Sequence, residues 1–204
     1  MSFSMQDHWY SRNYLPHRDA PGLAQFITFR LADSLPETTL RRIETELEMM
    51  PPSERKDARY RRLAALDDAG CGACVLRQAR LALLVENSLK FFHLQRYLLL
   101  CWVIMPNHVH VAIRTHPAWH LDDILHSWKS YTAHEANKIL GTQGEFWHRE
   151  FHDRWIRDGS HLQDVIRYTH NNPVKARLCQ EPENWPWTSA GRWQIDDRLL
   201  RENS

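Results

Sequence analysis

Two histidines separated by one residue lie in the apolar stretch CWVIMPNHVHVAI, residues 101–113. The alternation after the Pro-Asn pair predicts a β-strand that follows a tight turn, with His108 and His110 on one face and Val109 and Val111 on the other. A single histidine in such a strand is usually a hydrogen-bonded core residue. Two imidazoles on the same face can converge on one cation and leave room for a third ligand, so the spacing indicates a metal site.

A second group of polar residues lies in the stretch LDDILHSWKSYTAHEANKIL, residues 121–140. Helical spacing gathers its apolar residues into one stripe, with Glu135 inside the stripe and Tyr131 one turn earlier at its edge. A carboxylate within a packing stripe is unfavourable unless a cation meets it. A metal held by the histidine pair is one candidate for that cation, and the side chain of Lys138 or Arg149 is another.

A tyrosine beside a metal suggests one kind of reaction. The free phenol has a pKa of about 10 and is a weak nucleophile until a cation or a base draws off its proton. A divalent ion can polarise a phosphodiester and orient the leaving 3′ oxygen. The predicted products are a 5′-phosphotyrosine and a free 3′-hydroxyl. Because this exchange conserves the bond energy, the strand can be rejoined without a nucleotide cofactor.

Apolar alternation also predicts the sheet that carries the histidines. The stretch QFITFRL, residues 25–31, indicates a half-buried strand with Thr28 and Arg30 on its polar face. The nearly unbroken apolar run RYLLLCWVIM, residues 96–105, is typical of a central strand, and residues 146–158 contain a further strand. Helical patterns alternate with these strands. The expected fold class is α+β, with about four strands in one sheet.

Helical periodicity predicts a helix-rich insertion after the first strand, at about residues 36–92. Ser34 is the expected N-cap of its first helix, because Pro36 and a glutamate follow it. A later helix contains VIRYTHNN. It is expected to begin at a Ser160 cap and to end at Asn172, before a proline.

The chain divides into three parts on this interpretation. Residues 1–24 show little periodicity and form an N-terminal arm, and residues 25–178 form a single catalytic domain that includes the insertion. Residues 179–204 form an aromatic, turn-rich tail. The tail either packs over the sheet or clamps DNA.

Composition narrows the class of protein. The net charge is +1, so any nucleic-acid binding must depend on local basic patches. The N-terminus lacks a charged start followed by an apolar run, and no apolar stretch is long enough for a membrane span. The Cys-x-x-Cys at residues 71–74 has no second pair at zinc spacing, which favours two loop thiols. We therefore expect a cytoplasmic protein.

Two basic stretches supply the predicted DNA contacts. Guanidinium groups beside aromatic rings, as in FWHREFHDRWIRD, suit phosphates and unstacked bases. The predicted DNA-binding residues are Arg55, Lys56, Arg59, Arg149, Arg154, Arg157, Asn172 and Lys175. The alternative is that the first stretch is a solvated helix face, and that the later arginines pair with Asp153 and Asp158.

Four sequence blocks together resemble a known family. MPNHVHVAI, HSWKSYTAHEANK, FWHREFHDRWIRD and VIRYTHNNPVKARL are similar to blocks of the tyrosine transposases with a His-hydrophobe-His motif. More narrowly, they resemble the REP-associated tyrosine transposases of bacteria, relatives of the smallest insertion-sequence transposases, over most of residues 20–190. The resemblance implies a ferredoxin-like α+β domain that depends on Mg²⁺ or Mn²⁺. It also implies cutting and joining of single-stranded DNA near hairpins of repeated extragenic palindromes.

The resemblance assigns roles to individual residues. His108 and His110 match the metal-binding pair, and Tyr131 matches best as the nucleophile. Relatives carry a polar residue, commonly glutamine, one helical turn after that tyrosine, and Glu135 occupies this position as the expected third ligand. Tyr168, in VIRYTHNNP, is the alternative nucleophile, although packing of its ring against the sheet is the favoured role. The protein is expected to be a monomer or a homodimer.

Two other functions remain open. The chain could be a catalytically inactive protein that binds hairpin DNA, which predicts binding without a covalent adduct. It could also be a metal-dependent nuclease that uses water. That enzyme would leave cut DNA with no protein attached, and Tyr131→Phe would not impair it.

Overall fold

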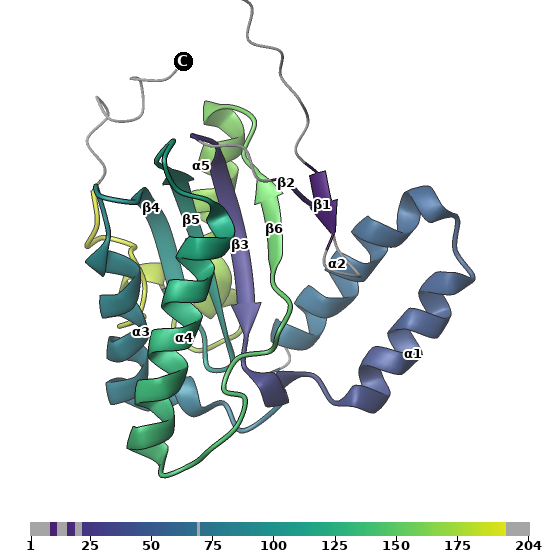
Figure 1. Cartoon of the computed structure of the whole chain (residues 1–204). Coiled ribbons are helices and arrows are strands. Elements are labelled where there is room, and N and C mark those ends of the chain that lie inside the picture. The colour runs from purple at the N-terminus through teal and green to yellow at the C-terminus, as the bar shows by residue number, and fades with distance from the viewer. Residues whose placement is uncertain (1–8, 12–15, 19–21, 69, 195–204) are drawn as a thin grey trace, which may run out of the picture.

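The computed structural model describes residues 9–11, 16–18, 22–68 and 70–194 (Figure 1). Its centre is a four-stranded antiparallel sheet in the order β4-β5-β3-β6. The strands are β3 (Ala24–Arg30), β4 (Tyr97–Ile104), β5 (His108–Thr115) and β6 (His152–Trp155). The predicted α+β class is therefore confirmed.

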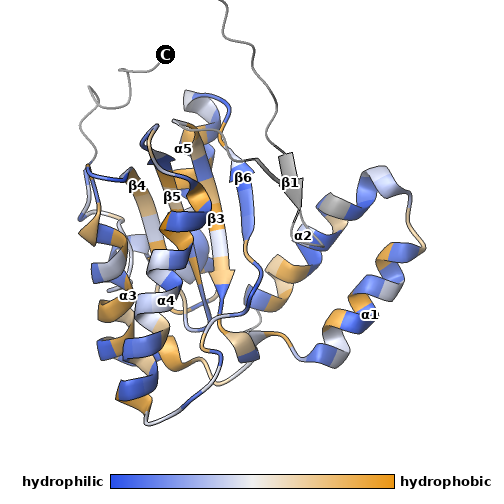
Figure 2. Cartoon of the chain, viewed as in Figure 1, coloured by the Kyte–Doolittle hydropathy of each residue, from blue (hydrophilic) through white to orange (hydrophobic). Residues whose placement is uncertain are grey.

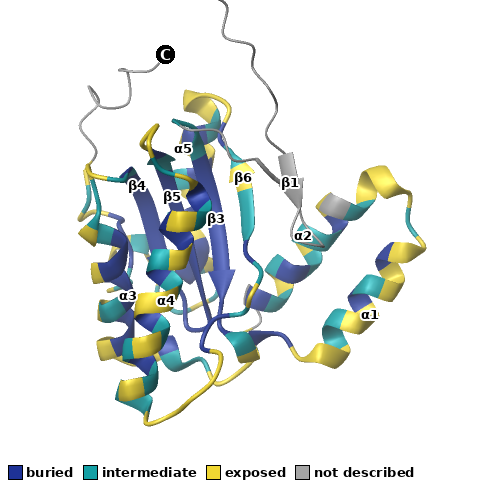
Figure 3. Ribbon diagram, viewed as in Figure 1, coloured by how far each residue is buried: buried dark blue, intermediate teal, exposed yellow. Residues whose placement is uncertain are grey.

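Helices cover both faces of this sheet. Helices α3 (Ala79–Phe91) and α4 (Leu121–Leu140) lie side by side on one face, and α5 (Gly159–Lys175) lies on the other (Figure 1). Strands β3, β4 and β5 are largely apolar, whereas β6 is hydrophilic (Figure 2). Strands β3, β4 and β5 are also buried along almost their whole length (Figure 3). No helix in the described part of the chain is long and apolar enough to cross a membrane.

Side chains of β3 alternate between the two layers, as the strand period requires. Ile27 and Phe29 belong to the core shared with α3 and α4, and Phe26 belongs to the core shared with α5. Thr28 and Arg30 point to the α5 side and are nonetheless buried. The prediction of a half-buried strand is therefore wrong. Other elements also pack over the polar face of β3.

Helices α1 (Glu37–Glu48) and α2 (Pro52–Asp68) form an antiparallel hairpin beside the sheet, with a small core of its own (Figure 1). They account for the first part of the predicted insertion, whereas α3 belongs to the main core. The predicted Ser34 cap is not formed. The N-cap of α1 is Pro36, and the Ser34 hydroxyl instead donates to the Leu31 carbonyl.

The ends of α5 also differ from the prediction. Its N-cap is Asp158, whose carboxylate accepts a hydrogen bond from the backbone N–H of His161 at 2.8 Å, so Ser160 lies inside the helix. The helix continues through Pro173 to Lys175. A proline in the last turn removes one N–H bond and leaves the preceding turns intact.

The tail packs along β4, the edge strand of the sheet. The backbone N–H of Ile104 donates to the Trp187 carbonyl at 2.8 Å, and that of Ser189 donates to the Trp102 carbonyl at 3.0 Å. These bonds cover an edge that would otherwise expose unpaired backbone groups. Of the two predicted roles for the tail, packing on the sheet is the one observed for residues 179–194.

The remaining elements are short. Strands β1 (Trp9–Ser11) and β2 (Pro16–Arg18) form a small antiparallel pair within the arm, which was not predicted. Single 3₁₀ turns occur at Ala32–Ser34, Val75–Arg77 and Pro182–Asn184.

Candidate active site

Strand register brings the polar residues of three strands together on the α5 side of the sheet. Thr28 of β3 pairs with His110 of β5 on one side and with His152 of β6 on the other. Arg30 pairs with His108 in the adjacent row. Directly paired residues point to the same face of a sheet, so these five side chains form one polar cluster within a largely apolar sheet.

The two histidines face each other through their Nε2 atoms, which lie 3.1 Å apart. The Nδ1 atom of His108 is 2.8 Å from Asn107 Oδ1, and the Nδ1 atom of His110 is 2.8 Å from Thr28 Oγ1. The Asn107 amide nitrogen donates to the Cys71 carbonyl at 3.1 Å, which fixes the amide oxygen toward His108. The Nδ1–H of His108 is therefore the donor, and its Nε2 carries the lone pair.

Burial keeps both imidazoles neutral. His108 and His110 are 0% and 2% exposed. Burial, together with the charges of the nearby Arg30, His152 and Lys175, lowers the pKa of His110 to about 3. Burial also lowers the pKa of His108 well below its ordinary value, with contributions from His110 and Arg30. A neutral imidazole is the form that binds a metal ion.

This arrangement fits a divalent ion. The two Nε2 atoms, 3.1 Å apart, would both be able to hold one divalent ion. Each Nδ1 has an oxygen partner, the usual means by which metal-binding histidines are oriented. Asn172 is a further candidate ligand, because it is 1% exposed and neither atom of its amide has a hydrogen-bond partner.

Tyr168 lies against this pair, one helical turn before Asn172 on α5. Its ring centroid is 5.5 Å from that of His110 and 5.8 Å from that of Phe26. The side chain is half-buried. The alternative nucleophile is therefore the tyrosine that the structure brings to the histidines.

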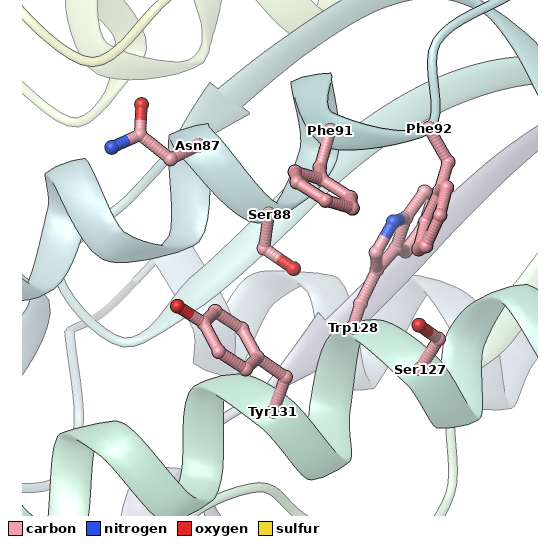
Figure 4. Close-up of a pocket in the computed structure, with 7 residues that line it drawn as sticks. All are labelled: Asn87, Ser88, Phe91, Phe92, Ser127, Trp128 and Tyr131. Atoms are coloured by element: carbon pink, nitrogen blue, oxygen red, sulfur yellow. The ribbon is translucent and has the colours of Figure 1, made fainter.

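Tyr131 lies on the opposite side of the sheet. Helix α4 packs against the other face, where Trp128 stacks on Phe29 with centroids 6.4 Å apart. Tyr131 is 55% exposed and lines a cavity of about 440 Å³ between α3 and α4, together with Phe91 and Ser88 (Figure 4). The prediction that Tyr131 joins the histidines is wrong within one chain, because the sheet separates them.

Glu135 lies on α4 with Tyr131, on the face of the sheet opposite to the histidines. Its carboxylate binds the Lys138 ammonium at 2.8 Å, and this hydrogen bond lowers the pKa of Glu135. Within the described part of the chain no three His, Cys, Asp or Glu side chains gather at a metal site. Within one chain Glu135 therefore does not join the histidines, and the lysine pairing that was the alternative is observed.

The predicted DNA-binding residues divide into two groups. Arg55 donates to the Met50 and Glu48 carbonyls, and Arg59 pairs with Glu44 at 2.8 Å, so both stabilise the α1–α2 hairpin. The side chain of Lys56 lies outside the described residues.

The second group lies in or beside β6 and at the end of α5. The side chains of Arg149, Arg154, Arg157 and Lys175 are exposed, and Arg154 follows His152 on the same face of β6. The prediction that Asn172 exposes a DNA-binding donor is wrong, because its side chain is buried.

Five residues of this region were not among the predicted site residues: Thr28, Arg30, Tyr60, Asp67 and His152. The Arg30 guanidinium lies 3.3 Å from the Asp67 carboxylate, and both side chains are buried. The polar face of the first strand could have indicated Thr28 and Arg30, because it alternates at the same period as the histidines. Tyr60 and Asp67 belong to α2, and no local sequence pattern predicts that they lie at the polar cluster.

Comparisons with known proteins support the predicted resemblance. Residues 85–172 match the family described as IS200-like transposases, a segment that includes the histidine pair and Tyr168. A solved REP-associated tyrosine transposase bound to a REP hairpin shares the fold, with a TM-score of 0.55 and 15% identity over 92% of this chain and 91% of that one. A transposase candidate from Deinococcus radiodurans gives a TM-score of 0.31 at 12% identity, over 80% of this chain and 96% of that one. No curated protein matches. The resemblance to IS200-like transposases is confirmed, and the fold is that of the REP-associated enzyme.

Proposed function

We propose that this chain is a transposase that cuts and rejoins single-stranded DNA at hairpins of repeated extragenic palindromes, with Tyr168 as the nucleophile. The observation that carries the proposal is the contact between Tyr168 and His110, whose Nε2 faces that of His108. The family match and the hairpin-bound enzyme of the same fold support the DNA substrate.

His108 and His110 would hold Mg²⁺ or Mn²⁺, and Asn172, one helical turn after Tyr168 on α5, would add its amide oxygen as a third ligand. The ion would supply Lewis-acid polarisation of the scissile phosphate. Asn107 and Thr28 hold the two imidazole rings in position through their Nδ1 atoms.

Tyr168 performs the exchange of bonds. Its phenol oxygen forms a bond to phosphorus while the bond from phosphorus to the 3′ oxygen breaks, and the phenol proton is lost to solvent as the 3′ oxygen gains one. The reverse attack by a 3′-hydroxyl restores the strand and frees the tyrosine. The exposed cations Arg154 and Lys175, near His152 and Asn172 in the chain, would hold the backbone phosphates.

A denaturing gel tests the proposal. Purified protein is incubated with an end-labelled single-stranded REP-type hairpin and Mn²⁺, and wild type is compared with Tyr168→Phe, Tyr131→Phe and His108→Ala. The expected result is a protein–DNA adduct in wild type and in Tyr131→Phe, and none in Tyr168→Phe or His108→Ala. The two tyrosine variants are matched, since each loses one hydroxyl and they lie on opposite faces of the sheet.

The other outcomes discriminate between mechanisms. An adduct that persists in Tyr168→Phe and disappears in Tyr131→Phe would overturn the assignment of the nucleophile. Cut DNA without attached protein would indicate a nuclease that uses water. Hairpin binding without any cleavage would indicate a DNA-binding protein that lacks catalysis.

A further inference from the structure

Helix α2 brings a second tyrosine to the polar cluster. The ring centroid of Tyr60 lies 4.2 Å from that of His152, the histidine paired with Thr28 in the row of His110. A narrow cavity of about 10 Å³ remains between α2 and the sheet, enough for about one water molecule. The residues that line it include Thr28, Arg30, Arg59, Tyr60, His110 and His152.

The position of Tyr60 follows from how α2 is fastened to the sheet. Tyr60, Ala64 and Asp67 are spaced i, i+4 and i+7, so they share one face of the helix. Asp67 at the far end of this face forms the buried ion pair with Arg30 of β3. Breaking a buried pair of this kind is costly, so the Asp67 contact holds the same face of α2, and Tyr60 with it, against the cluster.

Tyr60 also forms a hydrogen bond with Tyr168. Burial raises the pKa of Tyr60 above its ordinary value, and the charge of Tyr168 and this hydrogen bond raise it further. A hydrogen bond raises the pKa of a phenol when it stabilises the protonated form. Either hydroxyl can donate in the resting pair, and when the Tyr168 oxygen attacks phosphorus the Tyr60 hydroxyl is the group that can donate to it.

We propose that Tyr60 is a positioning residue that fixes the oxygen of Tyr168 for attack on the phosphate, so that the α1–α2 hairpin is part of the active site. This inference rests on the proposed function of Tyr168. A phenol oxygen has two lone pairs, so it can accept from Tyr60 with one and attack phosphorus with the other. The donated bond orients the nucleophile and stabilises the negative charge that grows on its oxygen as the proton leaves.

The decisive variant is Tyr60→Phe, which removes the hydroxyl and keeps the ring against His152. Single-turnover adduct formation is measured over a range of hairpin concentrations, in wild type, Tyr60→Phe, Tyr60→Ala and the control Tyr131→Phe. The maximal rate of Tyr60→Phe is expected to fall about 10- to 100-fold, whereas its half-saturating hairpin concentration stays near that of wild type. Tyr131→Phe is expected to match wild type in both.

Thermal unfolding separates positioning from a general structural role. Tyr60→Phe is expected to unfold close to the wild-type temperature, whereas Tyr60→Ala unfolds lower because it also loses the ring contact. If Tyr60→Ala is no slower than Tyr60→Phe below both unfolding temperatures, the hydroxyl accounts for the rate effect and the proposal is supported. A loss of rate in Tyr60→Ala alone would overturn it.

Three further outcomes would overturn the inference. A Tyr60→Phe variant as fast as wild type would show that the hydroxyl does not position Tyr168. A faster variant would show that Tyr60 restrains the nucleophile. A weaker hairpin affinity with an unchanged maximal rate would make Tyr60 a binding residue. In each case wild type still forms the adduct, so the function proposed for Tyr168 stands, whereas the absence of an adduct in wild type would refute both.

Discussion

Replacing Thr28 by valine tests the histidine pair without touching either histidine. Thr28 is buried at the centre of the polar row, and its hydroxyl is 2.8 Å from the Nδ1 atom of His110. Valine keeps the β-branched shape that suits β3 and removes only the polar group. The variant therefore leaves His110 in the strand but takes away the group that orients its ring.

The hydrogen-bond pattern explains why a hydroxyl is needed at this position. Because His108 donates through Nδ1 to Asn107, its Nε2 accepts the Nε2–H of His110. In that state the Nδ1 atom of His110 accepts from the Thr28 hydroxyl. Metal binding through both Nε2 atoms requires the proton of His110 on Nδ1 instead. A threonine hydroxyl can donate in the first state and accept in the second, which valine cannot.

The expected magnitudes follow from these contacts. A buried polar group left without a partner costs about 1–3 kcal/mol, and this loss should appear in the unfolding free energy of Thr28→Val measured without metal. Removing an oxygen that orients a metal-binding histidine typically weakens metal affinity about 10- to 100-fold. We expect a loss of Mn²⁺ affinity in this range.

The assay combines urea unfolding of the metal-free protein with Mn²⁺ titration followed by electron paramagnetic resonance. Thr28→Ser is the matched control, because it retains the hydroxyl and loses only a methyl group. It should bind Mn²⁺ within about threefold of wild type, less than the loss expected for Thr28→Val. If Thr28→Val binds Mn²⁺ as tightly as wild type, Thr28 does not orient a metal ligand and His110 is not one.

Two further predictions concern pH and salt. The pKa values of His108 and His110 are lowered in the folded protein, so the unfolded chain binds more protons below its ordinary histidine pKa of about 6.5. The free energy of unfolding should therefore fall as pH drops from about 6.5 toward about 3, by up to about 1.4 kcal/mol per pH unit for each histidine; a urea midpoint that stays constant between pH 6.5 and 5 would contradict this. Arg154→Ala and Arg157→Ala should each weaken hairpin binding and reduce the slope of log K against log salt by about 0.7–0.9, whereas Arg55→Ala, whose guanidinium binds backbone carbonyls, should leave the slope unchanged. Equal slopes for all three variants would argue against a DNA contact by Arg154 of β6 or by Arg157, which follows it.

The strands were predictable because alternation is a local property. The period of two placed His108 and His110 together on one face of β5 and Thr28 with Arg30 on one face of β3, and the structure has both arrangements. Which strand lies beside which is a long-range property. The row that joins His110, Thr28 and His152 depends on the pairing of β3 with β6, across more than a hundred residues of chain.

The contribution of α2 was not predictable for a similar reason. Its residues show weak amphipathic order, and the basic run at its start suggested a DNA-binding surface. In the structure Arg55 and Arg59 bind within the hairpin, and the opposite end of the helix supplies Asp67 to Arg30. The role of an insertion depends on which part of the fold it packs against. The sequence of the insertion alone does not predict that position.

The prediction of Tyr131 instead of Tyr168 as the nucleophile has a different cause. A tyrosine followed four residues later by a polar side chain occurs on two helices, as Tyr131 with Glu135 and as Tyr168 with Asn172. Helical spacing alone cannot decide between them, because it does not show which helix covers which face of the sheet.

The two helices differ in the polarity of the residues that they bury against the sheet. The stripe of α4 is apolar and large, with Ile124, Leu125 and Trp128, and it covers the face of Ile27 and Phe29. The buried residues of α5 turn polar toward its C-terminal end, at Thr169 and Asn172, although burying a polar group is costly unless it gains a partner or a ligand. A sheet face that carries histidines needs a covering helix with polar groups of its own, since each buried polar group requires a partner or a ligand. In the structure the polar end of the α5 stripe covers the polar face of the sheet, and this brings Tyr168 rather than Tyr131 to the histidines.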